Sequence, residues 1–314
     1  MFENRETCPA CGSPRHSVLH KVSYTDPAVL GFLVAYYRKV DPETIRNRLR
    51  GASYSVACCT ECALIYQREI PDQQLLTEIY TDWVLQADEL APTEPPQPIA
   101  HYAYIASEVM HLLAEQAKII GLDRRIRVLD FGMGWSTWLQ VARSFGAEVF
   151  GAELSAPKAA YALSIGIPVL NIEQIGEMKF DLLCTEQVFE HVSHPAELLR
   201  CLSASLAPTG YLKISVPDGG AIKAVLKTWS WSDPRPQEDS LMPIHPLEHI
   251  NCFDSRSLDA FASTCGLKRA PLNPFLAMAF TAGWSPPQSA VRNVLRPLFR
   301  FGLKRGTYAV YRHR

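Results

Sequence analysis

Short apolar runs alternate with amphipathic stretches through the second half of this 314-residue sequence. We expect buried strands at 127–131, 148–154, 168–170, 180–184 and 211–216. The stretches between them carry apolar residues at helical spacing, as at 135–145 and 195–206. Strands that alternate with helices in this way predict a parallel, doubly wound sheet, so the predicted fold class is α/β.

A glycine-rich turn lies between the first of these strands and the helix that follows it. It contains Asp130, Gly132, Met133 and Gly134. Glycines at this place let the backbone approach a ligand closely and leave N–H groups of the helix start free to bind it. Glu153 ends the second strand, where a carboxylate can accept hydrogen bonds from two ribose hydroxyls. The pattern therefore predicts a nucleoside-containing ligand.

Residue types within the turn separate two classes of such ligands. Asp130 precedes the first glycine by two positions, and its carboxylate would repel the pyrophosphate of a dinucleotide. The third glycine of a dinucleotide motif is absent, because Thr137 occupies its position. A carboxylate suits a ligand that bears an ammonium and a sulfonium. We therefore expect S-adenosyl-L-methionine (SAM) as the cosubstrate.

From about residue 100 onward the chain resembles the class I SAM-dependent methyltransferases. The family's D-x-G-x-G strand end and ribose-binding acid are matched by the turn and by Glu153. Its fourth-strand motif is matched by 180–192, and its turn into strand five by 206–217. The resemblance implies a Rossmann-like domain of seven strands, the last antiparallel at 307–311.

The same resemblance implies further residues of the donor site. Leu154 would flank the adenine, with Asn171 or Ile172 opposite it. Relatives that hold magnesium carry an acid where this chain has Gln187. We therefore expect no catalytic metal.

Two pairs of cysteines in the first 90 residues have the spacing of metal ligands. They are Cys8 with Cys11 and Cys59 with Cys62, out of nine cysteines in the chain. A C-x-x-C turn points both thiolates at one cation, and two such turns complete a tetrahedral site. Four thiolates leave no open position, so we expect a structural zinc ion. Cys58 could replace Cys59, although only Cys59 keeps the spacing.

The cysteine pairs ahead of the SAM domain add a narrower resemblance. They resemble the zinc-containing sugar C-methyltransferases of deoxysugar biosynthesis and their cell-surface polysaccharide relatives. Those proteins carry a Glu-His pair after strand five, matched here by Glu248 and His249. Where they usually have a tyrosine two residues earlier, this chain has Pro246.

Methyl transfer requires alignment of donor and acceptor and removal of a proton from the acceptor. Histidine suits the second task because its pKa lies near neutrality. His191 follows the fourth strand, at the sheet edge where α/β proteins bind ligands. His249, with Glu248 to orient it, is the other candidate base. Each could also be an ordinary histidine satisfied within its own loop.

Composition indicates a domain order and a compartment. We expect a zinc-binding domain at 1–90, a proline-rich linker at 91–98 and the methyltransferase domain at 99–314. The N-terminus is polar and lacks the apolar core of a secretory signal. The apolar stretch at 275–284 is about half of the roughly 20 residues that a membrane span needs. We therefore expect a cytoplasmic protein, in which disulfides are disfavoured.

Apolar and basic residues alternate at helical spacing over 288–303. Such a helix can lie on an anionic membrane or bind an acidic partner, and it can equally present a solvated basic face. Contact with a membrane would suit a lipid-linked saccharide as acceptor.

We therefore expect methyl transfer from SAM to a small molecule, such as a sugar, a glycan precursor or a glycosylated natural product. Two alternatives stay open. One is an RNA methyltransferase whose zinc module binds nucleic acid, although residues 1–90 carry no concentrated basic patch and the formal net charge is −1. The other is a catalytically inactive SAM-binding partner protein.

Overall fold

The computed structural model describes residues 2–84, 99–121, 123–232, 241–280, 295–303 and 306–314. The chain forms two compact units. We call residues 1–89, 189–196 and 217–261 the cysteine unit, and residues 90–188, 197–216 and 262–314 the parallel-sheet unit. The cysteine unit thus contains two segments from the region predicted as methyltransferase domain. The predicted linker at 91–98 lies outside the described residues.

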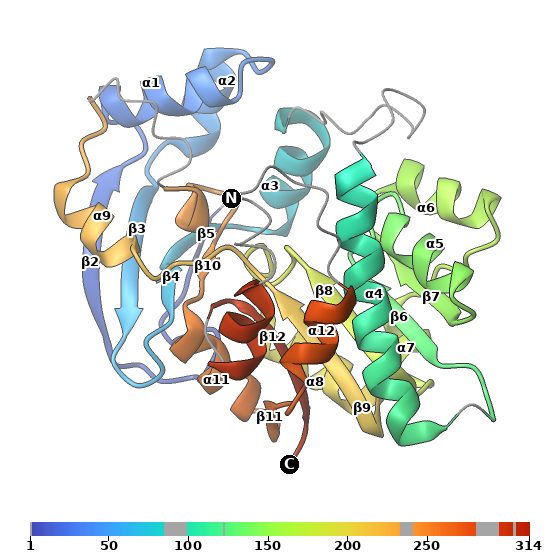
Figure 1. The fold of residues 1–314 in the computed structure, drawn as a ribbon. Coiled ribbons are helices and arrows are strands. Elements are labelled where there is room, and N and C mark those ends of the chain that lie inside the picture. The colour runs from blue at the N-terminus through green and yellow to red at the C-terminus, as the bar shows by residue number, and fades with distance from the viewer. Residues whose placement is uncertain (1, 85–98, 122, 233–240, 281–294, 304–305) are drawn as a thin grey trace. The chain divides into compact units, whose positions relative to one another are not determined.

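A six-stranded sheet forms the centre of the parallel-sheet unit (Figure 1). Its strands are, in spatial order, β11 (Leu267–Arg269), β12 (Tyr308–His313), β9 (Leu206–Ser215), β8 (Phe180–Glu186), β6 (Arg127–Phe131) and β7 (Glu148–Ala152). The pairs from β9 to β7 are parallel, and β12 is antiparallel to both of its neighbours. This arrangement confirms the predicted α/β class and the antiparallel last strand.

The expected strand at 168–170 is reduced to a single parallel bridge between Gly151 and Val169. Two backbone hydrogen bonds hold this segment beside β7, from Gly151 N to Pro168 O and from Leu170 N to Gly151 O. The bridge occupies the seventh strand position of the predicted sheet. A segment this short forms too few ladder hydrogen bonds to count as a strand.

The unit also contains helices, which alternate with the parallel strands or lie before the first and after the last of them in the sequence. They are α4 (Ile99–Ile120), α5 (Thr137–Ser144), α6 (Ala156–Ser164), α7 (Ile172–Gly176), α8 (Pro195–Ser205), α12 (Pro274–Phe280) and the π-helix η3 (Leu298–Gly302). The helices α4 and α5 lie side by side (Figure 1). Their apolar stripes bury Val109, Leu112 and Leu139 against Val128 and Leu182 of the sheet. This core holds β6, at whose end the glycine turn begins, beside β8.

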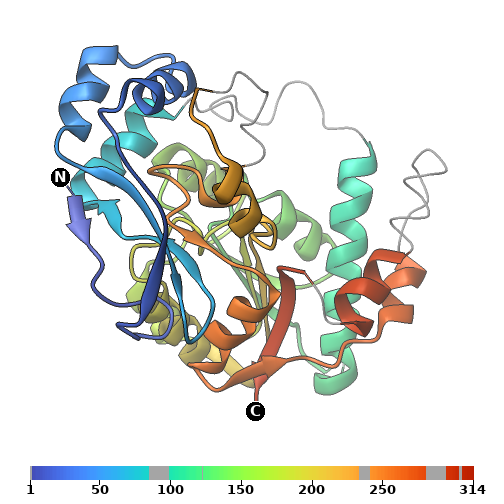
Figure 2. The ribbon, with the colours of Figure 1, turned by 90° about the vertical axis from the view of Figure 1, so that its left-hand side faces the viewer.

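The cysteine unit contains two antiparallel sheets. The larger orders β10 (Asn251–Cys252), β4 (Ile65–Gln67), β3 (Ser53–Cys59) and β2 (His16–Ser23), and the smaller pairs β1 (Phe2–Asn4) with β5 (Glu69–Pro71). The long strands β2 and β3 run side by side in blue in Figure 2. Strand β10 pairs with β4, so a segment at residues 251–252 extends the sheet formed by the first 90 residues.

Short helices complete the cysteine unit. They are α1 (Pro27–Tyr36), α2 (Pro42–Leu49), α3 (Gln73–Glu78), the π-helix η1 (Ile79–Trp83), α9 (Ile222–Thr228), the 3-10 helix η2 (Met242–Ile244) and most of α11 (Ser255–Ser263). Asp26, Asp41 and Asp72 cap the N-termini of α1, α2 and α3 through their side chains. The core includes the fully buried Tyr24, Tyr37 and Tyr54.

Among the described residues, we find no helix with the length and apolarity needed to cross a membrane. Of the predicted basic helix at 288–303, residues 288–294 lie outside the described residues. In the remainder, the guanidinium of Arg296 lies 5.5 Å from the ring centre of Tyr104, and that of Arg300 lies 3.9 Å from the ring centre of Tyr308. Leu295 and Phe299 are exposed.

Candidate functional site

The glycine turn at the end of β6 has backbone geometry that requires its glycines. Gly132 has φ 78° and Gly134 has φ 54°, in the region that side chains disfavour. A Cβ on Gly132 would lie 2.6 Å from Cγ2 of Val188, whereas a Cβ on Gly134 would meet nothing within 4 Å. Gly132 therefore packs against the segment after β8, and Gly134 leaves room for a ligand.

The backbone N–H groups of the turn are already bonded within the unit. Those of Gly132 and Met133 donate to Ala152 O at 2.8 and 3.2 Å. The N–H of Gly134 donates to Oε2 of Glu153 at 2.9 Å. The N–H groups of these three turn residues are therefore not available to a ligand, whereas the expectation of free N–H groups concerns the start of α5 at Thr137. Their bonds fix the turn to the end of β7, and the space beside Gly134 stays open to a ligand.

Glu153 is oriented by backbone donors on both sides. Its Oε1 accepts from Ser155 N at 2.8 Å, while Oε2 accepts from Gly134 N. Each oxygen keeps a further lone pair, so the carboxylate can still accept from hydroxyl groups. Leu154 beside it is fully exposed. An apolar side chain in this position offers a surface to a planar ligand.

The other predicted donor-site residues have separate places in the structure. The Met133 side chain is buried against Gly151, where a Cβ would lie 1.9 Å from its sulfur. The Asn171 side chain caps α7 by accepting from Gln174 N at 2.9 Å. Ile172, the next residue, is 41% exposed. The buried Met133 side chain is thus not available to a ligand, whereas Ile172 offers an exposed apolar side chain.

Asp130 is buried at the end of β6. Burial raises the pKa of its carboxyl to about 7, and the carboxylates of Glu186, Glu108 and Glu153 add to this effect. The ammonium of Lys213 opposes the rise. The turn is therefore rich in carboxyl groups, which suits a cationic ligand and disfavours a phosphate.

Sequence reasoning did not identify Lys213 or its partners. Lys213 in β9 is 2% exposed, and its Nζ lies 2.8 Å from Oε1 of Glu108 on α4. It also bonds to the carboxylate of Glu186 at the end of β8. The available signal was a lone charge within an otherwise apolar strand, since lysine is rarely buried without a charged partner.

Two histidines and a tyrosine meet in the cysteine unit. The rings of His191 and His249 are edge to face, with centres 4.6 Å apart. Tyr80 Oη lies 2.8 Å from Nδ1 of His191, and the Glu248 carbonyl lies 3.1 Å from the same nitrogen. Burial lowers the pKa of His191 to about 3 and also lowers the pKa of His249. Both imidazoles are therefore neutral near pH 7.

The sequence suggested that the carboxylate of Glu248 orients His249, but it does not. It accepts a hydrogen bond of 2.8 Å from Tyr37 Oη and lies 3.9 Å from Nδ1 of His245. Burial raises its pKa, and the hydrogen bonds from Tyr37 and Tyr36 oppose that rise. The carbonyl of Met242 instead bonds to Nδ1 of His249.

Glu190 brings a buried carboxylate to the same histidines. Its Oε1 lies 3.9 Å from Nε2 of His191. One ligand atom from each of Glu190, His191 and His249 lies within 4.8 Å of the others. A carboxylate at this distance stabilises an imidazolium once a histidine has taken up a proton.

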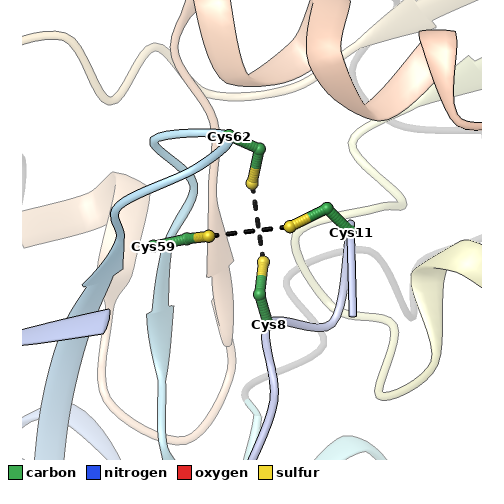
Figure 3. Close-up of side chains that lie close together, drawn as sticks. All are labelled: Cys8, Cys11, Cys59 and Cys62. Atoms are coloured by element: carbon green, nitrogen blue, oxygen red, sulfur yellow. Dashed lines mark hydrogen bonds between the residues drawn. The ribbon is translucent and has the colours of Figure 1, made fainter. Parts of the chain in front are cut away.

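The four predicted metal ligands converge in the cysteine unit (Figure 3). The sulfurs of Cys8 and Cys62 are 3.5 Å apart, and those of Cys11 and Cys59 are 3.6 Å apart. Four thiolates around a zinc ion at about 2.3 Å are separated by about 3.8 Å, so the donor set and spacing fit zinc. Hydrogen bonding to Cys62 lowers the pKa of Cys8 to about 5.

The two cysteine turns have the same backbone geometry. Gly12 N donates to Cys8 O at 2.8 Å, and Ala63 N donates to Cys59 O at 3.1 Å. Gly12 and Ala63, each directly after the second cysteine of a pair, have φ 74° and 65°. The Sγ of Cys58 lies 3.5 Å from the carbonyl oxygen of Cys59 and is not part of the cluster.

Arg5 connects the cysteine turn to the histidine loops within this unit, and no sequence signal pointed to it. Its guanidinium is buried and donates to Asn251 Oδ1 at 2.9 Å and to Ile250 O at 3.1 Å. It also donates to Ser193 O at 2.7 Å. These acceptors lie next to His249 and His191 in the chain. The contacts span up to 246 positions of sequence.

Comparison with known proteins identifies similar sequences. A family model described as methyltransferase domain matches residues 100–269. C-methyltransferase NovU from Streptomyces niveus is 29% identical over 140 residues, covering 40% of this chain and 33% of that protein. The ubiquinone biosynthesis O-methyltransferase of Rhodopseudomonas palustris strain BisB5 is 26% identical over 149 residues, covering 44% of this chain and 58% of that protein. The matches thus span a third to just over half of these relatives' lengths.

Among solved structures, the plantazolicin methyltransferase BpumL in complex with a monoazolic desmethylPZN analog and SAH has a TM-score of 0.45. Its sequence is 15% identical, and the superposition covers 76% of this chain and 94% of that chain.

Proposed function

The chain belongs to the methyltransferase domain family, and we propose that it transfers a methyl group from SAM to a small-molecule acceptor. One observation carries the proposal. The glycine turn of β6 and the acid that ends β7 are joined by the hydrogen bond from Gly134 N to Glu153. This bond places an open backbone surface beside an oriented carboxylate, as a nucleoside with a charged tail requires.

The charges of the turn support SAM as the donor. Glu153 would accept hydrogen bonds from the two ribose hydroxyls through its remaining lone pairs. Asp130 lies behind the glycines, where a carboxylate favours the sulfonium and ammonium of the methionine part. Leu154 and Ile172 would offer apolar surface to the adenine. When bound, SAM supplies the activated methyl group, and this chain's residues align it.

A histidine of the cysteine unit would take the acceptor's proton. The Nδ1 atom of His191 faces the carbonyl of Glu248, and that of His249 faces the carbonyl of Met242. Because a carbonyl oxygen only accepts, each Nδ1 carries the ring proton. The Nε2 atom is then the basic nitrogen of each ring. In the sequence, His191 follows the end of β8 by five positions, and α/β sheets bind ligands beyond the carboxyl ends of such strands. Glu190 would stabilise the imidazolium of His191.

For the acceptor we propose a sugar, a glycan precursor or a glycosylated natural product. The paired cysteines and the Glu248-His249 pair support this class through their resemblance to sugar C-methyltransferases. The similarity to C-methyltransferase NovU agrees with carbon as a methylated atom. Pro246 stands where the sugar C-methyltransferases usually have a tyrosine. The phenols of Tyr36 and Tyr37, which hydrogen-bond to Glu248, would supply hydroxyl groups there instead.

For the four cysteines we propose a structural zinc ion. No position of a tetrahedral Cys₄ site is open to a substrate, so the ion would hold the two turns together. Metal analysis of unchelated protein should find about one zinc per chain, and Cys8→Ser should lose it. Zinc far below one per chain in the wild type would remove the proposal.

Labelled methyl transfer tests the function. SAM with a labelled methyl group is incubated with nucleotide sugars and with extracted glycolipids, and label in the acceptor is measured for the wild type, His191→Asn and His249→Asn. We expect turnover with a saccharide and a loss of at least tenfold in the variant that lacks the base. Label entering RNA, or no acceptor at all despite SAM binding, would favour the nucleic-acid or inactive alternative. If a chelator abolishes turnover while the protein keeps its zinc, a second metal ion is required for catalysis. That result would argue against a histidine base.

A further inference from the structure

Lys213 is a buried cation that methyl transfer as described above does not use. Its ammonium lies within the sheet between Glu108 of α4 and Glu186 of β8. Burying an ammonium is costly unless it is paired and hydrogen-bonded. The two carboxylates satisfy that requirement and keep the pKa of Lys213 well above its ordinary value, against the effect of burial.

The two carboxylates differ in what they leave exposed. Glu108 is nearly buried, and Trp138 Nε1 donates to the same oxygen that faces Lys213, at 2.8 Å. The Glu186 side chain is 51% exposed. Ser215 Oγ donates to its Oε1 at 3.0 Å, and Lys213 binds its Oε2. The Glu186 carboxylate is therefore fixed by Lys213 and Ser215, while about half of its side chain remains exposed.

Sheet register places this open carboxylate beside the glycine turn. Phe131 at the end of β6 pairs with Thr185 of β8, so the next residues, Gly132 and Glu186, are level with each other. Gly132 also approaches Val188, two residues beyond Glu186. Gln187 between them has φ 52°, a conformation that is rare for a side-chain-bearing residue and recurs at functional sites.

The charge at this edge is complementary to the amino-acid end of the proposed donor. We propose that Glu186 binds the α-ammonium group of SAM and that Lys213 is a positioning residue that fixes the carboxylate of Glu186. This inference rests on the proposed donor. Asp130 at the end of the neighbouring strand adds a second carboxyl group close to the same place.

Two ligands that differ only in the amino-acid end test the proposal. S-adenosylhomocysteine (SAH) keeps the ammonium, whereas 5′-methylthioadenosine lacks the whole amino-acid portion. Calorimetry measures both with the wild type, Glu186→Gln and the matched control Glu197→Gln, which alters an exposed carboxylate of α8. We expect Glu186→Gln to weaken SAH binding by about 10- to 100-fold. Its affinity for 5′-methylthioadenosine should stay within about twofold, and the control should match the wild type.

Each other outcome overturns the proposal. Equal weakening of both ligands would show that Glu186 only supports the site, and unchanged SAH binding would show that it does not contact the ammonium. A wild type that binds 5′-methylthioadenosine and SAH equally would also exclude an ammonium contact. A wild type that binds neither ligand would overturn the proposed function itself, which separates the two failures.

Lys213 has its own test, because a merely structural lysine would not discriminate between the two ligands. Lys213→Met should weaken SAH selectively, as Glu186→Gln does, and Lys213→Arg should restore part of the affinity. Should Lys213→Met fail to fold, the arginine variant alone keeps the test, because its displaced charge should still weaken SAH more than 5′-methylthioadenosine. Equal effects on both ligands would contradict a positioning role.

Discussion

The backbone N–H of Gly134 donates a hydrogen bond of 2.9 Å to the carboxylate of Glu153. This bond joins the turn after β6 to the end of β7, two segments that neighbouring parallel strands bring to one edge of the sheet. Its effect is twofold. It fixes the left-handed turn at Gly134, and it orients a carboxylate whose remaining lone pairs are free for a ligand.

Asp130→Asn should stabilise the protein most at alkaline pH. The pKa of Asp130 is raised to about 7 in the folded chain, above the ordinary value of 3.8, so its ionisation opposes folding. The free energy of unfolding therefore falls as pH rises from about 4 to 7. Asparagine removes this dependence, so its stabilising effect should be on the order of 2 kcal/mol larger at pH 8 than at pH 5. Urea denaturation at both pH values measures the difference, and equal effects would contradict the raised pKa.

Donor binding should release a proton from Asp130. The ammonium group of SAH favours the ionised carboxyl, so binding shifts the pKa of Asp130 downward from about 7. The affinity for SAH should therefore fall about tenfold between pH 8 and pH 6. Calorimetry in two buffers of different ionisation enthalpy measures the released proton. Asp130→Asn serves as the control and should bind SAH more weakly with no such proton release, and release from the variant would assign the proton to another group.

Tyr80→Phe should impair turnover without weakening the donor. The Tyr80 hydroxyl lies 2.8 Å from Nδ1 of His191 and donates to the Glu248 carbonyl at 3.4 Å. Its loss frees the ring to rotate, which should lower kcat by about tenfold if this histidine takes part in proton removal. The SAH affinity should be unchanged. Tyr54→Phe is the matched control, because it removes a buried hydroxyl that donates to Ile244 O at 2.7 Å. Equal loss of kcat in both variants would indicate general loosening of the unit.

Arg5→Met should reduce both stability and turnover while the cysteine site stays intact. The guanidinium binds backbone and side-chain oxygens of the two loops that carry His191 and His249. Loss of these buried bonds should cost about 3 kcal/mol in the free energy of unfolding. Denaturation, metal content and methyl-transfer rate are compared with Arg15→Met, an exposed arginine of the same region. Full turnover at a temperature where Arg5→Met is folded would show that Arg5 has no positioning role.

Local patterns in the sequence predicted much of the fold and part of the site. Strand–helix alternation predicted the parallel sheet, and the glycine spacing predicted the turn that meets Glu153. The C-x-x-C spacing predicted which thiols converge, because each turn is set within five residues. Such features depend on neighbouring residues, so the sequence alone carries them.

Contacts between distant segments were not predictable in this way. Glu248 was expected to orient its neighbour His249, yet its carboxylate bonds to Tyr37, 211 positions away. Lys213 and Glu108 are 105 positions apart, and their pairing depends on how α4 packs on the sheet. These contacts depend on tertiary packing, so local sequence patterns do not predict them.

Calorimetric titration of SAH into the wild type and Glu153→Ala tests the central claim most directly. The wild type should bind one SAH per chain, and the variant should bind at least tenfold more weakly, because it loses the ribose acceptor and the bond to Gly134. Circular dichroism of both proteins confirms that the variant is folded. The absence of SAH binding by the wild type, or equal affinity in the folded variant, would contradict the account.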